Sequence, residues 1–281
     1  MGCFCGLLER VDGGGKREYG QESAGVRGMT SPMKKIAVVE DNPDNRLLVR
    51  VILEPFYEVH EYTDGPSVLA GLEPEKPDLL LLDISLPEMD GVAVLQRIRA
   101  TPGLRDLPVI ALTAHAMAGD REKYLSLGFD DYVTKPIVDE RVLLGAIQRR
   151  LAGGPPAPDT VPAEPGLVVS GTLDQLRKLG GDKFTAEMIE VFLEYTARKI
   201  AQGRLAYAEG DLVGVENALH PVKSSAGNIG AARIQELAAR IEDLARNREP
   251  EPIGSLLMEI NDAFISAKPQ LEQIRQSLIH L

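Results

Sequence analysis

Between residues 34 and 152 the chain alternates short aliphatic runs with longer amphipathic segments, and this alternation limits the fold more than any other feature of the sequence. The longer segments carry apolar residues three or four positions apart, such as Leu47 and Val51, or Leu95 and Ile98. Strands that alternate with helices favour a parallel sheet covered by helices on both faces. Five such units in about 120 residues are typical of a flavodoxin-like α/β fold. The strand-like runs are residues 36–39, 57–62, 79–82, 109–112 and 132–133.

The second half of the chain has no strand-like run after residue 173 and predicts an all-α domain. Four apolar stripes at helical spacing lie within residues 184–195, 212–229, 234–244 and 257–278. This pattern predicts a four-helix bundle, with a short helix at 173–179 that closes one end.

Residues 153–166 separate the two halves and contain five prolines and three glycines. Such a segment cannot build a core, so we interpret it as a linker. The predicted domains are therefore residues 33–152 and residues 167–281.

The charge of the chain bears on its partners. Lys and Arg number 31 against 42 Asp and Glu, which gives a formal net charge of −11. No part of the chain offers the positive field that a DNA-binding domain needs. The longest aliphatic run is residues 79–82, far too short to span a membrane. We expect an acidic, soluble protein that neither binds DNA nor inserts into a membrane.

The first 32 residues follow no regular pattern, and they hold the two cysteines of the chain, Cys3 and Cys5. The predicted domains therefore fold without disulfides, as expected in a reducing cytoplasm. We interpret residues 1–32 as a disordered leader, and a true start at Met29 or Met33 would exclude it.

Polar side chains stand at the ends of four of the predicted strands. Glu40 and Asp41 follow the first, Asp83 the third, Thr113 the fourth and Lys135 the fifth. In an open parallel sheet the carboxyl ends of the strands form the ligand-binding edge. Three carboxylates that lie close together need a cation, and hard oxygen ligands suit Mg²⁺. Any one of these residues could be an ordinary solvated loop residue, but all five together predict a site.

With these residues placed, the sequence resembles the receiver domain of two-component response regulators. The resemblance covers about residues 34–152 and rests on residues 38–42, 82–91, 112–114 and 131–136. It implies that Asp83 is the phosphoacceptor. It also implies that Asp41, Asp83 and the main-chain carbonyl of Ser85 hold Mg²⁺, while Glu40 reaches the metal through a water molecule.

The resemblance further assigns the residues that surround the phosphoryl group. Lys135 pairs with its charge, Thr113 donates a hydrogen bond to it, and Tyr132 is the switch residue that then turns inward. The peptide bond before Pro136 is expected to be cis, which aims the lysine.

Among the histidines of the second predicted domain, His220 is the candidate for a functional residue because of its neighbours on the helix. At about 100° per residue, His220, Ser224 and Gly227 fall on one narrow arc away from the apolar stripe, and Lys223 flanks that arc. Small neighbours would leave the imidazole accessible, and a cation nearby suits a phosphoryl group. On this evidence alone, a plain surface histidine on an amphipathic helix is the better explanation.

The segment 218–231 resembles the motif of the histidine phosphotransfer (Hpt) domain, and the resemblance extends over about residues 170–281. It implies that His220 is the phosphotransfer nucleophile. Ser224 stands where the family usually has glycine. Pro221 removes a helix hydrogen bond beside the nucleophile and predicts a local kink.

The sequence thus predicts a cytoplasmic phosphorelay protein of bacterial two-component signalling. Asp83 would take phosphate from a phosphohistidine donor, and His220 would pass it to or from a receiver aspartate. The expected partners are a sensor histidine kinase, of the hybrid type, and an upstream or downstream receiver. The chain lacks a nucleotide-binding loop, so we expect a phosphotransfer intermediate that ATP alone does not label. The alternative is a phosphorylation-switched binding module in which the bundle is an output surface and His220 is inert.

Overall fold

Each aliphatic run in the first half of the chain forms one strand of a single sheet. The computed structural model describes residues 33–113, 120–137, 139–155 and 171–279. The strands are β1 (Lys35–Val39), β2 (Glu58–Tyr62), β3 (Leu79–Asp83), β4 (Val109–Thr113) and β5 (Asp131–Thr134). All neighbouring strands pair in parallel, in the order β2-β1-β3-β4-β5. This topology confirms the predicted flavodoxin-like sheet.

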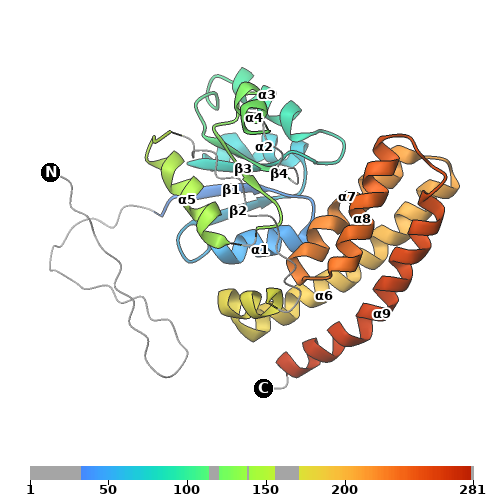
Figure 1. Cartoon of the computed structure of the whole chain (residues 1–281). Helices are drawn as coiled ribbons and strands as arrows, with labels where there is room; N and C mark the ends of the chain where they lie inside the picture. Colours follow the sequence, from blue (N-terminus) through green and yellow to red (C-terminus); the bar gives the residue numbers. More distant parts are fainter. Residues whose placement is uncertain (1–32, 114–119, 138, 156–170, 280–281) are drawn as a thin grey trace. The chain divides into compact units, whose positions relative to one another are not determined.

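Helices cover both faces of the sheet because successive strand residues point to opposite sides. In β1, Ile36 and Val38 join one apolar core and Ala37 and Val39 the other. The first core is closed by α1 (Pro43–Leu53) and α5 (Glu140–Leu151). The second is closed by α2 (Gly65–Glu75), α3 (Gly91–Ala100) and α4 (Asp120–Ser126). Figure 1 shows the sheet between these two layers.

The rest of the described chain is helical, as predicted. It consists of α6 (Thr172–Ala208), α7 (Leu212–Ile229), α8 (Ala232–Arg246) and α9 (Ile253–Ile279). The predicted short helix forms the first turns of α6, which is interrupted at Gly181 by a left-handed φ of 79°. The α7 backbone stays helical on both sides of Pro221. The all-α half of the predicted fold class is confirmed.

Local sequence signals fix the helices that carry the candidate site residues. Asn42 is the N-cap of α1, where its side chain accepts a hydrogen bond from the Asp44 amide, and a proline follows it in the first turn. Asp211 caps α7 in the same way, and Gly230 ends α7 with a left-handed φ of 79°. Such caps satisfy backbone groups that would otherwise lack partners.

Residues from 33 onward form one compact unit in which α1 packs against both α6 and α7. The leader 1–32 and most of the linker lie outside the described residues. The predicted domain boundaries therefore remain predictions. Within the described ranges, no helix is both long and apolar enough to cross a membrane.

Candidate functional site

Three carboxylates gather where β1 and β3 end. These strands are neighbours in the sheet, so Glu40 and Asp41 after β1 lie beside Asp83 at the end of β3. One carboxylate oxygen from each lies within 4.8 Å of the others. Glu40 and Asp83 are buried, whereas Asp41 is partly exposed. The topology thus brings the predicted acidic residues together.

The Lys135 ammonium group neutralises two of these carboxylates. Its Nζ lies 2.6 Å from Asp83 Oδ2 and 3.1 Å from Glu40 Oε2. The peptide bond between Lys135 and Pro136 is cis, as the resemblance implied. Burial would by itself raise the pKa of Asp83, but Lys135 and a hydrogen bond from the Ser85 amide hold that pKa below its usual value. These contacts favour the ionised form of the Asp83 carboxylate.

Negative charge remains in excess around Lys135. Burial, followed by the charge of Asp83, raises the pKa of Glu40. The same two causes raise the pKa of Asp41. Both shifts reflect burial and repulsion between neighbouring carboxylates, which a divalent cation would relieve. The set of hard oxygen donors fits Mg²⁺.

The remaining predicted residues of this site lie at or near β3, β4 and β5: Ser85 follows β3, Thr113 ends β4 and Tyr132 lies in β5. Ser85 is exposed, and its backbone amide donates a 3.0 Å hydrogen bond to Asp83 Oδ1. The Thr113 hydroxyl lies 2.8 Å from the Tyr124 hydroxyl. Tyr132 is partly buried, and its ring centre lies 6.1 Å from that of Tyr124. Thr113 and Tyr132 therefore share one neighbour, which links the predicted phosphate contact to the predicted switch.

His220 lies on α7 and contacts a carboxylate that the sequence did not single out. Its Nδ1 lies 2.7 Å from Oε1 of Glu242, a fully buried residue of α8. Lys223 Nζ lies 2.8 Å from the other oxygen, and Arg246 also binds this carboxylate. Burial would raise the pKa of Glu242, but His220 and Lys223 hold it far below its usual range. The result is an ionised carboxylate that orients the imidazole and leaves Nε2 free of this contact.

One expectation about the His220 surface is wrong. The arc of small residues was expected to be an accessible face, but Ser224 is buried and His220 is only 15% exposed, because α1 packs on this side of α7. Lys223 is paired with Glu242 in this structure, and its role toward a phosphoryl group stays a prediction.

Sequence reasoning also missed polar residues that α1 contributes. Asn45 donates a 3.1 Å hydrogen bond to Glu40 Oε1, and Asn42 donates through its backbone amide to the same oxygen. No spacing rule identifies them. Glu242 did leave a signal, because it is an acidic residue within the apolar stripe of its helix, next to Ile241.

Comparison with known families covers both halves of the chain. The model of the response regulator receiver domain matches residues 36–148, and the model of the Hpt domain matches residues 187–278. The order is the one predicted. The chain contains a receiver domain followed by an Hpt domain.

Known proteins match one or both domains. The signal transduction histidine-protein kinase BarA of Shigella flexneri is 32% identical over 249 residues, which cover 85% of this chain and 27% of that kinase. An uncharacterized 14.6 kDa protein of Leptolyngbya boryana is 44% identical over 124 residues, or 43% of this chain and 92% of that protein. A crystal structure of the receiver domain of a Pseudomonas aeruginosa sensor histidine kinase is 37% identical in sequence, and it holds a magnesium ion in its active site cleft. The match covers 43% of this chain and 99% of that chain, with a TM-score of 0.39.

The receiver–Hpt chain spans about a quarter of the length of the curated kinases that it matches. The two family matches and the relation to BarA support a role in two-component phosphorelay signalling.

Proposed function

We propose that Asp83 accepts a phosphoryl group from a phosphohistidine donor and that His220 exchanges a phosphoryl group with a receiver aspartate. The observation that carries this proposal is the pairing of Asp83 with Lys135 at 2.6 Å inside a cluster of three carboxylates. A buried carboxylate that is kept ionised beside a cation is suited to attack on phosphorus.

At the receiver site, an oxygen of Asp83 attacks the phosphorus in line, and the bond between phosphorus and the donor imidazole breaks. Lys135 then balances the charge of the acyl phosphate, and Thr113 is placed to donate a hydrogen bond to it. We assign Tyr132 as the switch residue. Glu40, Asp41, Asp83 and the Ser85 main-chain carbonyl would hold Mg²⁺, directly or through water, and the ion when bound would neutralise the phosphoryl oxygens.

At the Hpt site, Nε2 of His220 is the nucleophile. Glu242 accepts a hydrogen bond from Nδ1, which selects the tautomer with a lone pair on Nε2 and stabilises the positive charge of the phosphorylated ring. Lys223 can leave Glu242 to pair with the phosphoryl group. The residues of this domain supply only the nucleophile and its support, so the receiver must supply the rest of the catalytic groups.

The partners that this chemistry requires are a sensor histidine kinase and another receiver protein. We place the reaction in the cytoplasm, because Cys3 and Cys5 are the only cysteines and the two domains need no disulfide. The relation to the signal transduction histidine-protein kinase BarA is consistent with a histidine kinase as donor.

The test is phosphorylation of the full chain by radiolabelled acetyl phosphate with Mg²⁺, followed by separate measurement of acyl phosphate and of acid-labile, base-stable phosphohistidine. We expect Asp83→Asn to abolish both products and His220→Gln to abolish the phosphohistidine alone. ATP without a kinase should label neither residue.

Labelling of Asp83→Asn at the wild-type level would refute the assignment of the phosphoacceptor. A wild-type level of phosphohistidine in His220→Gln would refute the relay and favour a binding module switched by Asp83.

A further inference from the structure

A cluster of uncharged polar side chains joins the receiver to the Hpt domain. Asn42 and Asn45 belong to the start of α1, and Ser224, Ser225 and Asn228 belong to α7. We call these five residues the amide–hydroxyl cluster. All five are buried. Buried amides and hydroxyls are tolerated when each finds a partner, so this contact depends on matched donors and acceptors.

The hydrogen bonds of the cluster are well matched. Asn42 Nδ2 donates to the Ser225 hydroxyl at 2.8 Å and to the main-chain carbonyl of Pro221 at 3.1 Å. Asn45 Nδ2 donates to the Ser224 hydroxyl at 3.1 Å, while Asn45 Oδ1 accepts from Asn228 Nδ2 at 2.8 Å. Ser224, the residue that departs from the Hpt pattern, is thus a partner of the receiver.

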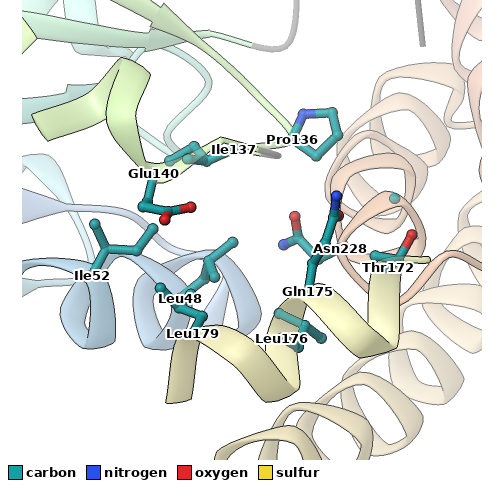
Figure 2. Close-up of a pocket in the computed structure, with 11 residues that line it drawn as sticks. Leu48, Ile52, Pro136, Ile137, Glu140, Thr172, Gln175, Leu176, Leu179 and Asn228 are labelled. Atoms are coloured by element: carbon teal, nitrogen blue, oxygen red, sulfur yellow. The ribbon is translucent and has the colours of Figure 1, made fainter. Parts of the chain in front are cut away.

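Apolar packing surrounds this cluster. Leu48 and Ile52 of α1 line a cavity of about 70 Å³ together with Leu176 and Leu179 of α6, as Figure 2 shows. The space is too small for a typical ligand and lies where the two domains pack. A methyl group added at Gly227 of α7 would lie 3.1 Å from the Pro136 ring, next to Lys135. Glycine at this position therefore permits the close approach of α7 to the receiver site.

This packing brings the two reactive residues close together. Asn42 directly follows Asp41 of the carboxylate cluster, and Pro221 directly follows His220. The side chain of Asn42 donates a 3.1 Å hydrogen bond to the main-chain carbonyl of Pro221. His220 is therefore near the carboxylate cluster of its own chain.

We propose that the amide–hydroxyl cluster determines the specificity of the relay and pairs Asp83 with His220 of the same chain. This inference rests on the proposed function. In the step itself, Nε2 of His220 forms a bond to phosphorus, the bond between phosphorus and the Asp83 oxygen breaks, and Asp83 leaves as a carboxylate. The proton on Nδ1 stays with the ring, beside Glu242. No further reactant is needed.

The cluster gives specificity because a partner without matching polar groups would bind less tightly. A foreign Hpt helix without hydroxyls or amides at these positions would bury Asn42 and Asn45 without partners. An unpartnered buried polar group is more costly than a made hydrogen bond is favourable. The chain's own α7 supplies the required partners and is also held nearby by covalent connection.

The order of the reaction tests this pairing. Acetyl phosphate and Mg²⁺ label the full chain, the donor is removed, and phosphohistidine is followed over about a hundredfold range of protein concentration. Transfer within one chain gives a rate constant that does not change with dilution. A mixture of Asp83→Asn chains with labelled His220→Gln chains should give little phosphohistidine.

Variants within the cluster make the test specific. Ser225→Ala with Asn228→Ala removes partners of both asparagines without adding bulk. We expect it to slow transfer about tenfold, with acyl phosphate formation at Asp83 unchanged. The matched control is Asn217→Ala, on the exposed side of α7, which should transfer at the wild-type rate. Circular dichroism establishes that each variant is folded.

The outcomes separate the two proposals. Phosphohistidine that forms at a rate proportional to protein concentration would overturn the pairing within one chain and leave the proposed function intact. Unchanged transfer in the double variant would overturn the role of the cluster. Acyl phosphate on Asp83 without phosphohistidine in any wild-type reaction would refute the relay itself, and the pairing with it.

Discussion

His220 and Glu242 lie on neighbouring helices, and Nδ1 of the imidazole is 2.7 Å from the buried carboxylate. We expect Glu242→Gln to slow phosphohistidine formation by about tenfold or more, because the variant loses the charge that stabilises the phosphorylated ring. The initial rate of transfer from a labelled receiver measures the effect.

The control for this prediction is Glu216→Gln, since Glu216 also binds Arg246 but does not contact the histidine. Equal rates for Glu242→Gln and the control would show that the carboxylate does not support the nucleophile.

Asp44 gives a prediction about pH. Burial raises the pKa of this α1 carboxylate to about 7, and the nearby Ser225 hydroxyl offsets the effect only in part. An unfolded aspartate has a pKa of about 3.9. At this group the folded state therefore binds more protons than the unfolded state between about pH 4 and pH 7, and the contribution of Asp44 to the free energy of unfolding falls as the pH rises through that range.

Asp44→Asn cannot ionise, so it should lack this fall and be more stable than wild type above pH 7, by roughly 2 to 4 kcal/mol. Urea unfolding at pH 5 and pH 8 measures the difference. Asp106→Asn, which changes an exposed aspartate, is the control. A similar loss of stability at pH 8 in wild type and Asp44→Asn would contradict the prediction.

Gly91 supports the end of β3. A methyl group at this position would lie 2.3 Å from the main-chain oxygen of Asp83 and 2.9 Å from Cα of Ile84. These backbone atoms can move away only at a large cost in energy. Gly91→Ala should therefore destabilise the protein by on the order of 2 kcal/mol and slow the phosphorylation of Asp83. Gly103→Ala meets no atom within 4 Å and should change stability by less than about 0.5 kcal/mol. Thermal unfolding and acetyl phosphate labelling test both; equal behaviour of the two variants would count against the steric argument.

Magnesium should stabilise the folded protein through the carboxylate cluster. At a concentration of Mg²⁺ about a hundredfold above its Kd, the free energy of unfolding should rise by about 2.7 kcal/mol. Burial and Asp83 raise the pKa of Asp41, so Asp41→Asn should be more stable than wild type in EDTA but lose most of the response to Mg²⁺. The Tm with and without Mg²⁺ measures this. A full magnesium response in Asp41→Asn would remove this residue from the ligand set.

Much of the receiver site could be predicted because the carboxyl ends of all strands in a parallel sheet lie along the same edge of that sheet. The aliphatic runs locate β1 and β3, and the residues that follow them must then lie side by side. Glu40, Asp41 and Asp83 are therefore close in space although the last is far from the others in sequence.

The partner of His220 was harder to predict, because Glu242 is 22 residues away and its pairing depends on how α7 and α8 are rotated against each other. Helical spacing shows which residues share a face but not what that face contacts. For the same reason Ser224 was expected to be exposed, whereas it is buried against Asn45 of the receiver. A helix face that packs against another domain has the same spacing of residues as an exposed face, so the sequence does not show the contact.

The amide–hydroxyl cluster has a consequence for how the chain responds to ionic strength. Among the described residues, the ion pairs of Lys135 and of His220 each lie within one domain, and the hydrogen bonds of the amide–hydroxyl cluster join neutral groups. Dissolved salt screens attraction between exposed charges beyond about 8 Å at physiological concentration, but it leaves buried hydrogen bonds between neutral groups almost unchanged. The contact between α1 and α7 should therefore persist at salt concentrations that dissociate a partner held by surface charge, so that salt would isolate the receiver–Hpt pair from its neighbours without opening it.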